Sequence, residues 1–279
     1  MKAQALSIII PVYNEEDYLF DCLTAIEKQT VMPDEVIVVD NNSSDNSVAI
    51  AKRFSFVTLV HETRQGLFYS RQTGMNMAKG DILCRIDADT IVDTGWVEHV
   101  KHAFKDTSVH ALTGPLGYHD FIAPRFARWL EHMFLVGAKK QGYDFLFGCN
   151  MAVRAKAWQK ITASLCNESF IFEDIDIAIH LKGHGIVPHY ARRMSAHVSA
   201  RRSHDRPKDF MRYIGGHSRT FKHHGIKKFA TNYSEWSFIA GYLLFRPFIM
   251  AFDPHTRKFS YSQYKYASKS ARPDPMNVD

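Results

Sequence analysis

The sequence predicts an α/β protein whose central sheet is mostly parallel and carries helices on both faces. Short apolar runs rich in Val and Ile alternate with helix-like segments between residues 6 and 90, a pattern typical of βαβ units. The runs are continuously apolar, so each strand should be buried on both faces. Polar clusters follow three of the runs, and ligands of such sheets bind at the carboxyl ends of the strands.

The expected elements follow in chain order. Strands are predicted at Leu6–Val12, Glu35–Asp40, Phe56–Val60 and Asp81–Ile86, and helices between them at Asp17–Lys28, Ser47–Phe54 and Tyr69–Ala78. The next region is less regular, with a turn at Thr113–Pro115, a helix at Ala123–Lys140 and a short strand introduced by Phe147–Asn150. A helix is predicted at Glu173–Lys182, because acidic residues fill its first turn and glycines follow its end.

The amino-acid composition changes after residue 205, and the chain is predicted to consist of a domain, an extension and a tail. Residues 1–205 form the α/β domain, residues 206–267 a helical extension rich in aromatic and basic side chains, and residues 268–279 a tail. The tail has two prolines and no apolar pattern, so we expect it to be disordered.

Composition excludes several classes of protein. Of the 279 residues, 46% are hydrophobic and 23% are charged, which supplies a packed core and excludes wholesale disorder. The formal net charge of +6 is far below that of a dedicated nucleic-acid binder, and no helix-turn-helix or zinc-finger spacing occurs. It suits phosphate-bearing ligands or an acidic membrane surface.

The cysteines and apolar segments predict a cytoplasmic protein. The four cysteines are scattered without CxxC pairs, as expected of reduced thiols rather than a disulfide framework. The first apolar run is too short for a signal-peptide core. No segment is long enough to span a membrane, because the nearest candidate, Trp236–Phe252, is interrupted by Arg246-Pro247.

Asp87-Ala88-Asp89 is the sharpest chemical feature. In an extended backbone, residues i and i+2 project to the same face. Two carboxylates placed in this way repel each other unless a cation joins them. Mg²⁺ or Mn²⁺ bound by carboxylates and substrate phosphates is the natural partner. The alternative is that this motif is an ordinary polar loop after a strand.

Two further acidic positions stand out. Asp40 ends an apolar strand, where its carboxylate can accept a hydrogen bond from a base or a ribose hydroxyl, whereas Ser44 and Asp45 fit a simple turn and helix cap. Glu173, Asp174 and Asp176 begin a helix among large apolar residues. Helix-dipole stabilisation explains such acids in part, and a general base is the functional alternative.

The histidines predict no zinc site. His180 and His184 stand four residues apart, and Asp176 extends this stripe. Gly183 interrupts the helix, however, and no HExxH pattern exists. His197 and His204, which follow the acidic helix, remain candidates to complete a metal shell.

Taken together, six segments in order resemble the family-2 inverting glycosyltransferases, whose nucleotide-binding fold is of the GT-A type. The segments are Ile10–Glu16, Val38–Asp45, Ala78–Thr90, Thr113–Pro115, Gly148–Arg154 and Phe172–Asp176. The resemblance implies an enzyme that moves a sugar from a nucleoside-diphosphate sugar to an acceptor hydroxyl with inversion.

The resemblance also implies roles for single residues. The nucleoside pocket would comprise Pro11, Tyr13, Glu15, Asp40 and Ser43, and Arg71 would approach the diphosphate, with Gln72 in place of the usual asparagine. Asp87 and Asp89 would bind the ribose-diphosphate and Mg²⁺ or Mn²⁺, with Asp89 the more direct metal ligand and His197 a third. Asp174 would be the catalytic base, Glu173 its neighbour at the acceptor, and Gly148 and Asn150 would shape the sugar site.

The chemistry of sugar transfer fits these residues. A sugar leaves a diphosphate only if the developing negative charge is stabilised, and an acceptor hydroxyl needs a base to take its proton. One in-line displacement inverts the anomeric centre.

The pocket residues are expected to accept UDP or GDP, with UDP preferred. The expected acceptor is a sugar or a lipid-linked molecule.

The extension after residue 206 has two interpretations. Basic residues accompany the apolar segment Trp236–Phe252, namely Arg201, Arg202, Arg206, Lys208, Arg212, Arg219, Lys222, Lys227 and Lys228. The segment either packs against the core or another subunit, or it contacts an anionic membrane surface. The second case would place the protein at the cytoplasmic face of the inner membrane.

Three rival functions are weighed against transfer. A sugar nucleotidyltransferase would carry a glycine-rich loop at the position of Pro11–Glu15, where this chain has no glycine. A catalytically inactive nucleotide-sugar binding protein would not be expected to keep all of Asp87, Asp89 and Asp174. A nucleic-acid binder is disfavoured by the absence of a known motif.

Overall fold

The computed structural model describes residues 4–121, 128, 145–168, 170–226, 229–253, 256, 258–262 and 264, with backbone alone for 229–234 and 237. Apart from residue 128, the helix predicted at 123–140 lies outside the described residues, as does the tail predicted from residue 268.

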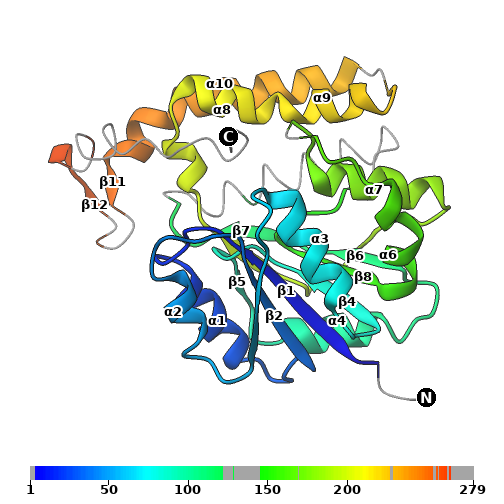
Figure 1. Ribbon diagram of the computed structural model, residues 1–279. Helices are drawn as coiled ribbons and strands as arrows, with labels where there is room; N and C mark the ends of the chain where they lie inside the picture. The colour runs from blue at the N-terminus through cyan, green and yellow to red at the C-terminus, as the bar shows by residue number, and fades with distance from the viewer. Residues whose placement is uncertain are drawn as a thin grey trace.

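A mixed, mostly parallel sheet forms the centre of the molecule (Figure 1). In the described residues its order is β3-β2-β1-β4-β8-β6-β9. The strands are β1 (Leu6–Val12), β2 (Glu35–Asp40), β3 (Val57–His61), β4 (Ile82–Arg85), β6 (Ala111–Thr113), β8 (Met151–Arg154) and β9 (His189–Tyr190). Strand β1 pairs in parallel with both β2 and β4, whereas β8 runs antiparallel to both β4 and β6.

Burial on both faces of the sheet confirms the interpretation of the apolar runs. Every residue of β1 is buried. Ile8 and Ile10 belong to one apolar cluster, while Ile9 between them belongs to the other, because successive side chains of a strand point to opposite faces. Helices therefore pack on each side of the sheet and fix the level at which the strands end.

Four helices agree with predicted ones to within a few residues: α1 (Leu19–Glu27), α2 (Ser47–Ala51), α3 (Leu67–Met77) and α7 (Glu173–Gly183). The sequence analysis did not predict α4 (Trp96–Ala103) or α6 (Ala155–Ile161), which is followed by a short turn η1 (Thr162–Ser164). The first cluster includes residues of α1 and α4, and the second includes residues of α3, α6 and α7. A separate small sheet, β5-β10-β7, is formed by Ile91–Val92, Ala196–Val198 and Leu116–Tyr118.

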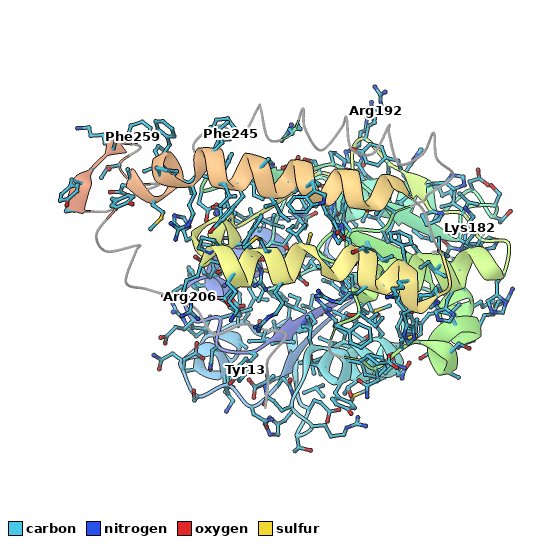
Figure 2. All side chains as sticks on the ribbon, turned by 90° about the horizontal axis from the view of Figure 1, so that it is seen from above. Tyr13, Lys182, Arg192, Arg206, Phe245 and Phe259 are labelled. Carbon is cyan, nitrogen blue, oxygen red and sulfur yellow. The ribbon has the colours of Figure 1, made fainter. Side chains whose placement is uncertain are left out.

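The last third of the described chain adds a layer of helices. After η2 (Arg201–His204) come α8 (Pro207–Ile214), α9 (Gly216–His223), α10 (Phe229–Ala251) and a hairpin of β11 (Phe252–Asp253) and β12 (Lys258–Phe259). Figure 1 shows α8, α9 and α10 stacked over the α/β part, and Figure 2 shows α10 running beside α8 and α9. Among the described residues, no helix is long and apolar enough to cross a membrane.

Candidate active site

The loops after β1 and β2 lock together at one edge of the sheet. Asn14 and Asn42 adopt positive φ angles of 54° and 63°, which asparagine tolerates better than most residues. The Asn14 Oδ1 atom accepts a hydrogen bond from the Ser44 N–H (2.8 Å), and Ser43 Oγ accepts one from the Asn14 N–H (3.1 Å). These hydrogen bonds join the loop after β1 (residues 13–16) to the loop after β2 (residues 41–45), and we call the joined surface the ledge.

The predicted nucleoside residues line this ledge. Asp40 is buried, and its carboxylate accepts the Ser43 N–H (3.2 Å) and lies 3.0 Å from His61 Nδ1. Pro11 is buried in β1 opposite Val39, beyond the last residue of β1 that pairs with β4, so its missing N–H removes no bond to that strand. Tyr13 is 46% exposed at the end of the strand, where its ring is available to a ligand.

Asp87 and Asp89 follow β4 and engage different arginines. Asp87 Oδ1 lies 3.7 Å from Arg71 Nη2, and Asp89 Oδ2 lies 2.9 Å from Arg201 Nε. Asp89 is largely buried, whereas the Asp87 side chain is 37% exposed. The two carboxylates thus face separate cationic partners within one acidic turn.

Glu173 joins two arginines from different elements. Its carboxylate accepts hydrogen bonds from Arg71 of α3 and from Arg85 Nη1 of β4, the latter at 2.8 Å. Burial opposes the charge on Arg71, but the Glu173, Asp87 and Asp174 carboxylates outweigh this effect and raise the pKa of its guanidinium. Glu173 therefore positions Arg71 and would have to release these arginines to contact an acceptor. The role that the family pattern implies for Glu173 stays a prediction.

Asp174 begins α7 beside the loop that contains Gly148. The Gly148 N–H donates to Asp174 Oδ2 (3.2 Å), while the Arg85 side chain donates from Nε to the Gly148 carbonyl (2.7 Å). A Cβ atom built on Gly148 would lie only 1.5 Å from Arg85 Nη2. The site therefore requires glycine at this position for steric reasons.

Printed contacts aside, arginines link the three predicted carboxylates. Arg71 lies 3.7 Å from Asp87 and donates to Glu173, the residue before Asp174. Asp89 follows in the same turn as Asp87. Burial raises the pKa of the Cys149 thiol, and all three acids raise it further. Two distant parts of the sequence thus supply acids to one part of the molecule.

Tyr213 of α8 packs beside the start of α7. Its ring centre lies 4.9 Å from that of Phe172, the residue before Glu173, and Arg202 lies 4.5 Å from the centre of the Tyr213 ring. Burial raises the pKa of the Tyr213 hydroxyl to about 12, opposed by Arg202 and reinforced by Asp174 and Asp87. Helix α8 therefore borders the candidate site, which the sequence analysis did not anticipate.

Arg201 is a second residue that the sequence analysis missed. We had grouped it with surface basic residues, but its side chain is only 17% exposed. It donates from both terminal nitrogens to Glu15 (2.6 and 2.7 Å) and stacks 4.6 Å from the centre of the Tyr18 ring. Arg201 thus connects the predicted nucleoside residue Glu15 to the predicted metal ligand Asp89.

The donor atoms of the cluster suit a divalent cation. Glu15, Asp87, Asp89, Glu173 and Asp174 supply carboxylate oxygens, several of which also contact Arg71, Arg85 or Arg201. Carboxylate oxygens are the donors that Mg²⁺ and Mn²⁺ prefer.

Asn150 supports the site from beneath. It is fully buried, and its Oδ1 accepts a hydrogen bond from the Trp96 indole (2.9 Å) while its Nδ2 donates to the carbonyls of Pro115 (3.2 Å) and Met194 (2.8 Å). A direct contact with substrate would require Asn150 to give up these bonds. The structure shows Asn150 holding three segments together, and its substrate contact stays a prediction.

His197 lies in the small sheet. Its Nε2 atom is 3.3 Å from Asp93 Oδ1. A Cβ atom built on Gly117 would lie only 2.4 Å from its Nδ1 atom. These contacts are with the strands beside Asp89, and the role of His197 as a metal ligand stays a prediction.

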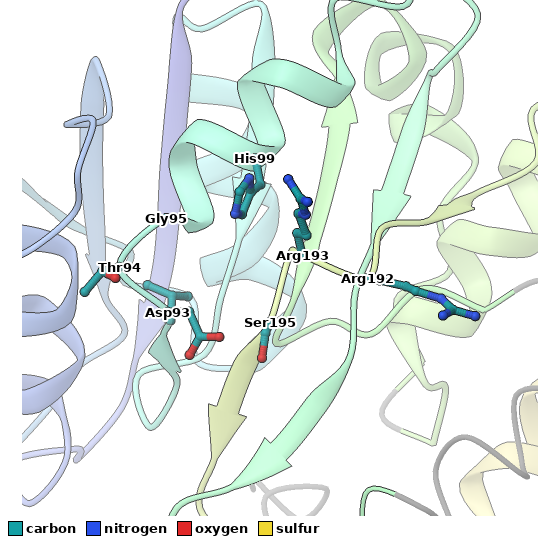
Figure 3. A pocket seen from close by; sticks show the side chains of 8 residues that line it. Asp93, Thr94, Gly95, His99, Arg192, Arg193 and Ser195 are labelled. Carbon is teal, nitrogen blue, oxygen red and sulfur yellow. The ribbon is translucent and has the colours of Figure 1, made fainter.

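A separate open hollow of about 660 Å³ lies beside Asp93 (Figure 3). It is lined by Val92, Asp93, Thr94, Gly95, His99, Arg192, Arg193 and Ser195. None of the predicted site residues lines it, so we place the candidate active site at the carboxylate cluster.

Comparisons with known proteins identify the family to which the chain is similar. A family model described as glycosyl transferase family 2 matches residues 7–162. Glycosyltransferase AglE of Haloferax volcanii is 35% identical over 116 residues, covering 39% of this chain and 38% of the relative. Glycosyltransferase GlyG of Streptococcus pneumoniae is 30% identical over 117 residues, covering 40% and 39%. The matches thus span about two fifths of these curated relatives.

A solved structure shows the same fold over nearly the whole chain. The mannosyltransferase PcManGT from Pyrobaculum calidifontis, in complex with GDP-Man and Mn²⁺, matches 99% of this chain and 78% of its own, with a TM-score of 0.58 and 18% identity. The architecture is therefore of the GT-A type, as the sequence predicted.

Proposed function

Because the chain belongs to glycosyl transferase family 2, we propose that it transfers a sugar from a nucleoside-diphosphate sugar to an acceptor hydroxyl with inversion. The observation that carries this proposal is the chain of contacts from Asp87 through Arg71 to Glu173, the neighbour of Asp174. Through Arg201, Asp89 is joined to Glu15 at the ledge formed by the β1 and β2 loops.

The residues divide the work of binding and catalysis. Asp40, Glu15 and Tyr13 would hold the nucleoside at the ledge, and Arg71 would approach the diphosphate. Asp174 would take the proton of the acceptor hydroxyl as that oxygen attacks the anomeric carbon. The bond from this carbon to the diphosphate breaks in the same displacement, so the product has the inverted configuration.

Asp87 and Asp89 would hold a divalent cation, since both supply carboxylate oxygens in the turn that follows β4. Bound Mg²⁺ or Mn²⁺ would supply positive charge to the departing diphosphate. Before that, Asp89 must exchange part of its interaction with Arg201. The Mn²⁺ in the PcManGT complex supports this assignment.

The donor is proposed at the level of a nucleotide class. UDP-sugars remain our first choice from the sequence, and GDP-sugars are the alternative because PcManGT was solved with GDP-Man. Both present a diphosphate to the same acidic turn.

A lipid-linked acceptor at an anionic membrane surface is the second part of the proposal. Large apolar side chains of α10 are exposed, among them Trp236 (69%) and Leu244 (67%). Figure 2 shows Phe245 of α10 and Phe259 of the hairpin at the same end of the molecule. The corresponding location at the cytoplasmic face of a membrane stays a prediction.

Thermal unfolding with nucleotides tests the donor site. The full chain is heated with UDP, GDP or TDP, each with Mn²⁺ or with EDTA. We expect one nucleotide to raise the melting temperature in Mn²⁺ and to have much less effect in EDTA, because a ligand of the native state stabilises it. Asp89→Asn should lose this shift, whereas Asp21→Asn on the exposed side of α1 should keep it.

The matching nucleotide sugars are then screened for release of the nucleoside diphosphate. Mn²⁺-dependent release distinguishes an enzyme from an inactive binding protein, which would show the thermal shift alone. The absence of any nucleotide-dependent shift would contradict the proposal, and a product that retains the donor's anomeric configuration would contradict single displacement.

A further inference from the structure

Four potential metal ligands meet on the side of α7 that faces α9. They are Cys166, Asp176, His180 and His224, and their ligand atoms all lie within 4.8 Å of one another. Cys166 precedes α7, Asp176 and His180 are one helical turn apart within it, and His224 immediately follows α9. Three separate segments of the chain therefore deliver the cluster.

The distances between the ligand atoms fit a small cation. Asp176 Oδ1 lies 2.7 Å from His224 Nε2 and 3.4 Å from His180 Nε2, and Cys166 Sγ lies 3.9 Å from His224 Nε2. Around tetrahedral zinc, bond lengths of about 2.0 to 2.3 Å separate neighbouring donors by roughly 3.3 to 3.8 Å. Side-chain adjustments of about 1 Å or less would bring these pairs to that spacing.

One buried nitrogen in the cluster lacks a hydrogen bond. Among the described residues, His180 Nε2 is buried and has no hydrogen-bond partner, and Asp176 Oδ1 lies 3.4 Å from it. A polar atom removed from water without a hydrogen bond is costly, and an imidazole nitrogen in this position is a possible metal ligand.

The other ligands are also arranged for coordination. Asp176 is fully buried, and its Oδ2 accepts the Cys166 N–H (2.9 Å), so that Oδ1 is left facing both histidines. Cys166 Sγ lies 3.9 Å from His224 Nε2, on the same side of the cluster.

A metal-free polar cluster explains less of this arrangement. The contact between His224 and Asp176 would satisfy that pair, but it leaves His180 Nε2 without a partner. A second set, formed by Cys166, Glu168 and His223, is more exposed and has three members. The four-membered buried set is therefore the stronger candidate.

We infer that Cys166, Asp176, His180 and His224 bind one Zn²⁺ that ties α7 to the end of α9. Nitrogen and sulfur donors favour Zn²⁺ over Mg²⁺ or Mn²⁺, and four protein ligands leave no position for a reacting water, as in a structural site. The sequence analysis rejected His180 and His184 because Gly183 ends the helix; the structure supplies His224 from another helix instead.

The inferred site would brace the helix that carries Asp174. The start of α7 already meets α9, because the Phe172 N–H donates to Thr220 Oγ1 (2.8 Å) and the Phe172 ring packs on Gly216 and His217. Zinc would add a second tie one turn further along. This inference is independent of the donor site, since it uses none of the residues there.

Metal content tests the inference directly. The full chain without an affinity tag is stripped with a chelator, reloaded with Zn²⁺, dialysed and analysed by mass spectrometry of the metal. We expect one zinc per chain, falling at least about tenfold in Cys166→Ser and His224→Gln. His184→Gln, an exposed histidine at the end of the same helix, and Asp89→Asn at the donor site should both keep the full content.

Cobalt substitution provides a readout that does not depend on the stability of a variant. Co²⁺ added to the stripped wild-type chain should produce a thiolate-to-cobalt charge-transfer band, which Zn²⁺ should displace. If the wild type binds no zinc and shows no such band, the site does not exist. Equal zinc retention by folded Cys166→Ser and by His184→Gln would also overturn the inference.

Discussion

Gly148 is the position where a single added methyl group would reach the centre of the site. Its Cβ would overlap the Arg85 guanidinium, which is buried and bonded to Glu173 and to the Gly148 carbonyl. Overpacking of this kind costs about 1–3 kcal/mol. We therefore expect Gly148→Ala to lower the free energy of unfolding by this amount and to slow sugar transfer, because Arg85 must release Glu173.

Gly241 provides the matched control for this prediction. It lies inside α10 with open space where a Cβ would be, so Gly241→Ala should be neutral or stabilise the helix by about 0.5–1 kcal/mol. Urea unfolding of both variants measures the difference. Equal stability of the two variants would show that Arg85 moves aside at no cost.

Arg201 and a bound metal are expected to compete for Asp89. Arg201 pairs with Asp89 and Glu15 at once, so Arg201→Gln should leave both carboxylates freer to attract a cation. Loss of an ion pair worth about 1 kcal/mol would tighten Mn²⁺ binding about fivefold. Titration calorimetry with Mn²⁺ measures this change, and weaker binding in Arg201→Gln would mean that the arginine does not oppose the metal.

At the scale of elements, α10 exposes large apolar side chains, and the amino-acid pattern alone could not show which residues of the helix these are. The sequence marked Trp236–Phe252 as apolar, and the structure shows which of its side chains remain uncovered. If this surface contacts membranes, the chain should sediment with vesicles that contain an anionic lipid. Trp236→Ser combined with Leu244→Ser should reduce the bound fraction severalfold at low salt.

Val187→Ser is the control for the vesicle experiment. Val187 is also an exposed apolar residue (47%), but it follows α7 rather than lying on α10. Its replacement should leave sedimentation unchanged. A wild-type chain that stays in the supernatant at low salt would refute membrane contact, and the exposed surface would then require another partner.

Local patterns predicted the elements better than their pairing. The run Leu6–Val12 matches β1 residue for residue, and Glu35–Asp40 matches β2, because each is bounded by polar or turn-forming residues. The antiparallel direction of β8 could not be predicted, since hydrophobic periodicity is the same in both directions. Likewise, the position of α8 beside the start of α7 depends on packing between segments that are distant in the sequence.

At the scale of the whole molecule, the sequence predicted Asp87, Asp89, Asp174 and Arg71 as site residues but gave no role to Arg85 or Arg201. The predicted acids occur in short, ordered motifs, and the structure links them through arginine contacts. Arg85 lies inside an apolar strand and Arg201 in a run of basic residues, so neither had a local signal for its contacts. Asn150 is fully buried, which hydrophobic periodicity could not predict, and its substrate contact stays a prediction.

The central claim is that one cluster, assembled from both ends of the α/β part, binds a nucleotide sugar and deprotonates an acceptor. Its two functions can be separated, because Asp174 contacts the Gly148 backbone whereas Asp40 and Glu15 lie at the nucleoside ledge. A base can therefore be removed without removing the nucleotide site.

The most direct test compares wild type and Asp174→Asn in the presence of Mn²⁺, with nucleotide affinity measured by calorimetry and sugar transfer measured by product formation. We predict that nucleotide affinity stays within a few-fold while the transfer rate falls by about 10²–10⁴-fold. Transfer at the wild-type rate, or loss of nucleotide binding together with transfer, would contradict the role of Asp174 as the base.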